Sequence, residues 1–166
     1  MTSATVLDTI NDVFVLSTAG IPYYATCFGG EICKRRPDHL LQSGFIVAMF
    51  QFSKEFGQKT IIQVEFDEGL MVFGRREVGA EEILVVFFTT REVGYSQIRG
   101  LVDKAGDAFI DEYGERIQVA KFVNVEDYSG FSEILRGLDL INRPPMGNLP
   151  IAGKKESLWA KIRRKF

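Results

Sequence analysis

The sequence of 166 residues predicts an α+β domain, in which an antiparallel β-sheet is covered by helices. Two observations support this fold class. Short runs of β-forming residues follow one another across tight turns, which favours antiparallel pairing. Longer segments with helical periodicity lie between and after these runs. The expected order of elements is strand, strand, helix, three strands, helix, helix.

Five segments have the composition of β-strands. They cover residues 13–18, 23–28, 59–66, 70–75 and 81–90. Gly20-Ile21-Pro22 joins the first two strands, and Asp67-Glu68-Gly69 joins the third to the fourth. Both tripeptides are typical of tight turns, so the strands on either side are expected to pair as hairpins.

Three segments are predicted to be helical, namely residues 37–57, 94–117 and 128–140. Pro37-Asp38 marks the beginning of the first helix, and Gly57 marks its end. The second helix has one apolar face, formed by Ile98, Leu101, Val102, Ala105, Ala108 and Phe109. Such a one-sided pattern is typical of a surface helix on a core.

The sequence divides into a domain and two C-terminal segments. Residues 1–141 contain all the predicted elements, residues 142–153 (NRPPMGNLPIAG) have the composition of a linker, and residues 154–166 form a basic tail. The tail has six basic residues and one acidic residue, a net charge of +5. Because the whole chain carries −2, the preceding residues carry −7.

Composition excludes several classes of protein. A net charge of −2 argues against nucleic acid as the main partner. The longest apolar runs, 44–50 and 83–88, are too short to span a membrane, and residues 1–13 lack the features of a secretion signal. We therefore expect a cytoplasmic protein, able to bind membranes peripherally, with Cys27 and Cys33 reduced.

The first predicted helix is apolar on two sides. Six residues form a stripe that is expected to dock on the sheet: Leu41, Phe45, Ala48, Met49, Phe52 and Phe56. Four further apolar residues lie on the opposite side among polar ones: Leu40, Ile46, Val47 and Phe50. Either another part of the chain covers this second side, or it is a protein interface with Phe50 as the central anchor.

The sequence shows no catalytic set and implies neither a metal nor a cofactor. His39 is the only histidine, which excludes sites built from several imidazoles. Cys27 and Cys33 do not have the C-x-x-C spacing of a redox pair. The carboxylates near Glu65 and at Glu126-Asp127 are explained by a polar turn and a helix start. We therefore expect a protein that is not an enzyme.

The tail combines apolar and basic residues at helical spacing. The residues that would contact an anionic membrane surface are Leu158, Trp159, Lys161, Ile162, Arg163, Arg164, Lys165 and Phe166. An acidic groove on a protein is the second interpretation, and a disordered tail without a partner is the third.

The order of elements resembles the longin family and the wider roadblock and profilin-like group. The resemblance rests on the Gly20-Ile21-Pro22 turn, the apolar helix 39–56, the strands in 59–90, and the segments 109–113 (FIDEY) and 131–135 (FSEIL). It implies a five-stranded antiparallel sheet between one long helix and two C-terminal helices. It also implies pairing with another longin-like protein, or with a second copy, through the first helix. No heptad region follows the domain, unlike in SNAREs.

The sequence and the resemblance together favour a protein-interaction adaptor of longin type. Its expected setting is membrane traffic or the regulation of small GTPases. The alternative hypothesis is a small-ligand sensor with a pocket between a helix and the sheet.

Overall fold

The computed structural model describes residues 6–29 and 39–145. A short 3₁₀ turn, η1 (Val6–Thr9), leads into strand β1 (Ile10–Ser17), and β2 (Pro22–Cys27) follows. Helix α2 (His39–Gly57) precedes the strands β3 (Gln63–Phe66), β4 (Gly69–Val78) and β5 (Glu81–Thr90). The long helix α3 (Tyr95–Val119), the 3₁₀ turn η2 (Val125–Tyr128) and helix α4 (Phe131–Gly137) complete the described chain.

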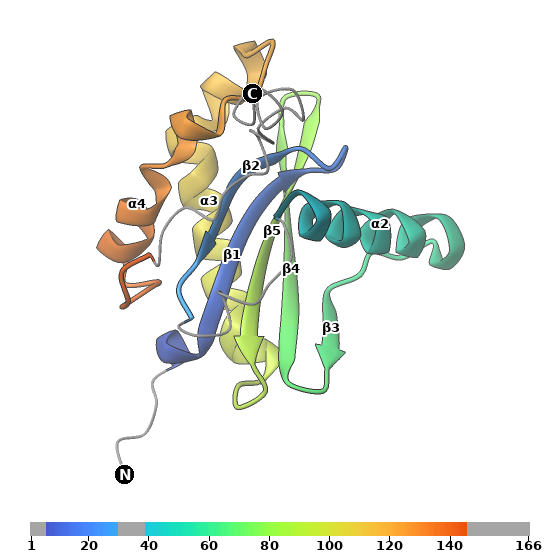
Figure 1. Ribbon diagram of the computed structural model, residues 1–166. Helices are drawn as coiled ribbons and strands as arrows, with labels where there is room; N and C mark the ends of the chain where they lie inside the picture. The colour runs from blue at the N-terminus through green and yellow to red at the C-terminus, as the bar shows by residue number, and fades with distance from the viewer. Residues whose placement is uncertain (1–5, 30–38, 146–166) are drawn as a thin grey trace, which may run out of the picture.

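The five strands form one antiparallel sheet in the order β2-β1-β5-β4-β3. The β1–β2 hairpin pairs Phe14 with Ala25, and the central β1–β5 ladder pairs Phe14 with Val86. Figure 1 shows α2 on one face of this sheet and α3 with α4 on the other. The predicted fold class is therefore confirmed, including five strands between one helix and two.

Several predicted elements differ from the structure in their bounds, among them the third strand and the third helix. The third strand begins at Gln63 and not at residue 59. The reason is that the backbone N–H of Ile61 donates to Ser53 Oγ of α2, so that the segment before β3 is tied to the helix. The predicted third helix, 128–140, is shortened to α4, which begins at Phe131 and ends at Gly137; Tyr128 instead ends the 3₁₀ turn η2.

Alternating strand residues form two hydrophobic cores. Toward α3 and α4, the core includes a group of five aromatic rings, those of Tyr23, Phe109, Tyr113, Tyr128 and Phe131. Tyr24 joins this layer, since its hydroxyl lies 2.7 Å from Ser132 Oγ of α4. Toward α2, the core is formed by Phe14, Leu16, Ala25, Met71, Phe73, Leu84 and Val86 of the sheet.

The end of the described chain is bound to its beginning. Arg143 donates to the backbone carbonyls of Asp8 and Ile10 at 2.6 and 2.8 Å. Asn142 donates to the Asp8 carboxylate. The first two residues of the predicted linker are therefore in contact with the domain, and most of the linker lies outside the described residues.

Candidate protein-interaction surface

The side of α2 that faces the sheet is the one we expected to be free. Ile46, Val47 and Phe50 are only 1%, 8% and 0% exposed, and they lie in the same core as Phe14, Phe73 and Leu84. The prediction that these three residues form a protein interface is therefore wrong, because the domain's own sheet buries them. The side chain of Leu40, the fourth residue of that prediction, lies outside the part that the structure describes.

Polar residues lie at the rim of the buried face of α2. Gln51 and Lys54 have polar partners on the sheet side of the domain. Gln51 donates to the carbonyl oxygen of Thr18 at 3.0 Å, and Lys54 Nζ lies 3.6 Å from Glu82 of β5. Lys54 also lies over the ring of Phe50, as does Arg75. A polar residue at the rim of a buried helix face is thus compatible with docking when loops and strand ends offer acceptors.

The opposite face of α2 is exposed and apolar. Leu41, Phe45, Phe52 and Phe56 are 67%, 54%, 63% and 77% exposed, and Ala48 lies exposed between them. We call these five residues the outer stripe. The expectation that they dock on the sheet is wrong, since the sheet holds the other face. The helix is nevertheless apolar on both sides, as the sequence indicates, so one apolar face remains without cover from the described chain.

The aromatic residues of the outer stripe are partly organised. The rings of Phe52 and Phe56 stack with centroids 4.5 Å apart and planes inclined by 28°. Beyond the end of the helix, Ile62 is also exposed, directly before edge strand β3. Large exposed apolar side chains in a row are uncommon on a monomeric surface and mark interaction sites.

A basic depression of about 610 Å³ lies at the C-terminal end of α2. It is lined by Lys54, Gln58, Lys59, Thr60 and Arg75. Glu82 forms ion pairs with both Lys54 and Arg75, two of the three cations that line the depression. Arg76, the next residue along β4, points to α3 and forms ion pairs with Asp103 and Asp107. Arg75 and Arg76 therefore serve two different surfaces.

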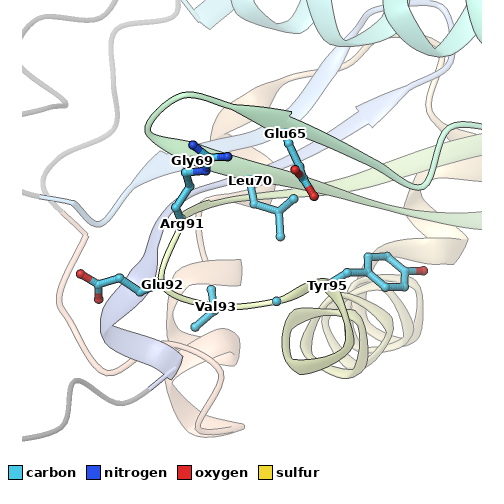
Figure 2. Close-up of a pocket in the computed structure, with 8 residues that line it drawn as sticks. Glu65, Gly69, Leu70, Arg91, Glu92, Val93 and Tyr95 are labelled. Carbon is cyan, nitrogen blue, oxygen red and sulfur yellow. The ribbon is translucent and has the colours of Figure 1, made fainter.

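A second pocket, of about 280 Å³, lies between the β3–β4 hairpin and the start of α3 (Figure 2). Glu65 and Leu70 point from the hairpin toward α3, whereas Glu92 and Tyr95 point away from the centre. Arg91 also lines the pocket and donates to the backbone carbonyl of Asp67. The pocket thus combines one apolar wall with charged groups of both signs.

Several predicted features lie outside the described residues or differ from expectation. The whole basic tail, 154–166, lies outside them, as do Cys33 and the side chain of His39. Cys27 is disulfide-bonded, which corrects the expectation that it is a free thiol. Across residues 6–29 and 39–145, no cluster of three or more histidine, cysteine, aspartate or glutamate side chains could hold a metal ion. None of the helices in this part combines the length and the apolar composition needed to cross a bilayer.

A scan against models of known protein families found no match, and a search among curated proteins found no relative. The surface chemistry of the domain therefore provides the evidence on function.

Proposed function

We propose that this protein is a non-enzymatic protein-interaction adaptor of longin type, which docks a partner domain on the outer stripe of α2. The partner is another longin-like protein or a second copy of the chain, and a small GTPase is a further partner. The setting is membrane traffic or small-GTPase regulation on the cytoplasmic side of a membrane, where the basic tail supplies attachment to an anionic lipid surface.

The observation that carries this proposal is the exposure of the outer stripe. Phe45, Phe52 and Phe56 each leave more than half of their surface in contact with solvent, although the same helix buries Phe50 completely. Exposing apolar surface costs about 25 cal/mol per Å² relative to its burial. A partner that covers these rings removes that cost, and aromatic side chains are the usual anchors of protein interfaces.

The sheet order also supports the proposal. The long helix α2 comes between the two edge strands, β2 and β3, in sequence, and among the described elements it is the one that lies on its face of the sheet (Figure 1). The resemblance to longin domains implies this arrangement and implies pairing through this helix. The interface residues now follow from exposure: Leu41, Phe45, Phe52 and Phe56 replace the buried Ile46, Val47 and Phe50.

Affinity capture, with the purified protein as the bait, tests this function. The wild-type chain is compared with a Phe45→Glu/Phe52→Glu double variant, whose substitutions lie on exposed positions and leave the core intact. We expect the wild type to retain a small GTPase or a second longin-like domain, identified by mass spectrometry. The double variant should lose that protein, because two carboxylates would be buried without partners in the interface.

Phe122→Glu provides the matched control. Phe122 is 88% exposed and lies in the segment between α3 and η2, away from α2. This control should retain the same partner as the wild type. Equal retention by the stripe variant, the control and the wild type would show that the outer stripe is not the working surface.

The pocket beside α3 favours the alternative function, a small-ligand sensor. Its volume of about 280 Å³ and its lining by Glu65 and Arg91 suit a small polar ligand. Ligand pockets usually enclose roughly 300–1,000 Å³ and are mostly apolar. This pocket is small and partly charged, and we therefore place the adaptor function first.

A further inference from the structure

The basic depression at the C-terminal end of α2 is lined by hydrogen-bond donors. Its volume is about 610 Å³, and its walls carry three cations, an amide and a hydroxyl: Lys54, Lys59, Arg75, Gln58 and Thr60. Each of these side chains can donate a hydrogen bond, and none of them is negatively charged. The depression therefore has the chemistry of an anion-binding site.

Two of the cations reach the depression from different elements and are held in place there. Lys54 comes from α2 and Arg75 from β4, and both lie over the ring of the buried Phe50, at 5.5 and 5.6 Å from its centroid. Glu82 of β5 forms ion pairs with both, and Arg75 Nε lies 3.0 Å from its carboxylate. Because these two long side chains are already ordered, less conformational entropy is lost when a ligand binds.

The loop that carries Lys59 is also fixed. The backbone N–H of Ile61 donates to Ser53 Oγ of α2, and the carbonyl oxygen of Ile62 accepts from the backbone of β4. Gln58 has a left-handed backbone, with a φ of 50°, which residues other than glycine seldom adopt. Glycine would adopt this conformation without strain. The chain thus places an amide side chain in the wall of the depression at a cost in backbone strain.

The charges in the depression do not cancel. Lys54, Lys59 and Arg75 contribute +3, and the carboxylate of Glu82, which pairs with two of them, contributes −1. The C-terminal end of a helix adds roughly half a negative charge, which leaves about one and a half positive charges. Lys59 has no ion-pair partner among the described residues. Stabilisation of the helix end alone therefore does not account for three cations.

The size of this excess indicates the kind of anion. A phosphomonoester carries about −1.5 to −2 charges near neutral pH and has three strong acceptor oxygens. It therefore matches both the remaining charge and the donors of the depression. A phosphodiester, with a single negative charge, would leave part of the positive charge without a partner.

Two exposed apolar side chains indicate a membrane as the source of the phosphate. Phe56, which is 77% exposed, lies two residues before Gln58 in sequence, and Ile62, which is 48% exposed, lies two residues after Thr60. A soluble ligand inside the depression would gain nothing from apolar groups at its margins. At a bilayer surface, such groups are buried at the boundary between headgroups and acyl chains, beside basic residues that attract the headgroups.

We propose that the basic depression binds the phosphorylated inositol headgroup of a membrane lipid, so that the C-terminal end of α2 faces the bilayer. A phosphorylated ring fits a depression of about 610 Å³, whereas a phosphate group alone would leave most of it empty. The contact lies in the domain and is separate from attachment through the basic tail. It goes beyond the proposed function, because it assigns a ligand and an orientation on the membrane.

Co-sedimentation of the full-length chain with vesicles tests this inference. One set of vesicles contains phosphatidylcholine with a phosphorylated phosphatidylinositol, and the other contains phosphatidylcholine with phosphatidylserine at the same total charge. The chain is used with its natural tail and with Arg163→Glu/Arg164→Glu, which lowers the charge of the tail from +5 to +1. In both forms we expect tighter binding to the phosphorylated inositol lipid, because phosphatidylserine carries no phosphomonoester.

Three substitutions, made in the form with the altered tail, locate the contact. Lys59→Glu should weaken binding to the inositol lipid roughly thirtyfold, since it removes one favourable charge and adds an unfavourable one. Thr60→Val keeps the shape and the charge but removes a donor, and should weaken this binding about tenfold without affecting phosphatidylserine vesicles. Lys104→Glu is the matched control on α3, on the other face of the sheet (Figure 1), and should bind as its parent does.

Equal binding to the two kinds of vesicle would overturn the inference, because the attraction would then be diffuse. Equal losses in Lys59→Glu and Lys104→Glu would do the same. Calorimetric titration with soluble inositol trisphosphate separates a lipid from a soluble ligand, and equal affinity for the soluble headgroup and the vesicles would overturn the membrane assignment. Binding of a phosphorylated peptide by a chain that ignores the vesicles would also overturn it.

Hydrogen exchange of the unaltered chain keeps the test valid if a variant fails to fold. On vesicles with the phosphorylated inositol lipid, the amides of residues 58–62 should exchange more slowly than on phosphatidylserine vesicles, while those of α3 should not change. Unchanged exchange in residues 58–62 of a vesicle-bound chain would overturn the inference. The adaptor function would still stand, because its own test depends on Phe45 and Phe52.

Discussion

Single residues decide which face of α2 belongs to the core. Phe50 and Phe52 are two positions apart in sequence, yet Phe50 is fully buried and Phe52 is mostly exposed. Both are phenylalanines on the same helix, so their side chains differ only in what surrounds them. They form a matched pair for testing the orientation of the helix.

Phe50→Ala should lower the free energy of unfolding by about 3–5 kcal/mol, since it removes a buried ring and leaves a cavity against the sheet. Phe52→Ala should change it by no more than about 0.5 kcal/mol. Urea unfolding of dilute protein, followed by circular dichroism, measures both values. Equal losses, or a greater loss for Phe52→Ala, would show that the helix docks by its other face.

The buried hydroxyl of Tyr24 should make the domain less stable at alkaline pH. Burial raises the pKa of its hydroxyl to about 12, although hydrogen bonds with Ser132 and Thr26 lower it in part. In the unfolded chain the phenol ionises near pH 10. The contribution of Tyr24 to stability is therefore complete below about pH 10 and is lost as the pH rises toward 12.

Tyr24→Phe should make the decrease of unfolding free energy across this interval shallower. At neutral pH it should cost about 1 kcal/mol, because the Ser132 hydroxyl loses its partner. Urea unfolding at a series of pH values measures both effects. Tyr95→Phe, at the half-buried start of α3, is the control and should keep the steep decrease. An equally steep decrease in Tyr24→Phe would contradict the prediction.

At the scale of elements, the close approach of α3 to β4 determines how the helix lies on the sheet. A Cβ atom at Gly74 of β4 would lie 2.6 Å from Cγ1 of Val102 on α3. Glycine at this position therefore allows the helix to rest directly on the strand. A side chain there would push the two elements apart.

Gly74→Ala should lower the free energy of unfolding by about 1–3 kcal/mol through this overlap. Adding Val102→Ala should recover part of the loss, because the two positions share one contact. Gly100→Ala on α3, where a methyl group meets open space, should be neutral or stabilising by up to about 1 kcal/mol. Thermal unfolding of the wild type, Gly74→Ala, Val102→Ala, the double variant and Gly100→Ala gives the comparison. Additive losses for Gly74 and Val102 would contradict the contact.

Element order could be predicted from the sequence, because turns such as Gly20-Ile21-Pro22 and Asp67-Glu68-Gly69 determine local pairing. The start of β3 could not, since a hydrogen bond to Ser53 decides it. The docking face of α2 could not be predicted either. A helical wheel separates two apolar faces but does not contain the sheet, and the acceptors that satisfy Gln51 and Lys54 come from distant parts of the chain.

At the scale of the whole molecule, the domain places its two functional candidates on different faces. The outer stripe lies on the α2 side of the sheet, and the polar pocket beside Glu65 opens near the start of α3 (Figures 1 and 2). A fold of this kind does not determine function by itself. What distinguishes the two candidates is chemistry: a row of exposed phenylalanines favours a protein partner, whereas Glu65 and Arg91 favour a small polar ligand.

The order in which the strands are synthesised has a consequence for the nascent chain on the ribosome. β1 lies in the interior of the sheet, but its neighbour β5 is made about 70 residues later, as the pairing of Phe14 with Val86 shows. Until β5 leaves the ribosome, one edge of β1 lacks its partner strand, and the face that packs toward α3 and α4 lacks those later helices. We expect the first half of the chain to need protection from aggregation during translation, and the sheet to close only when β5 inserts between β1 and β4.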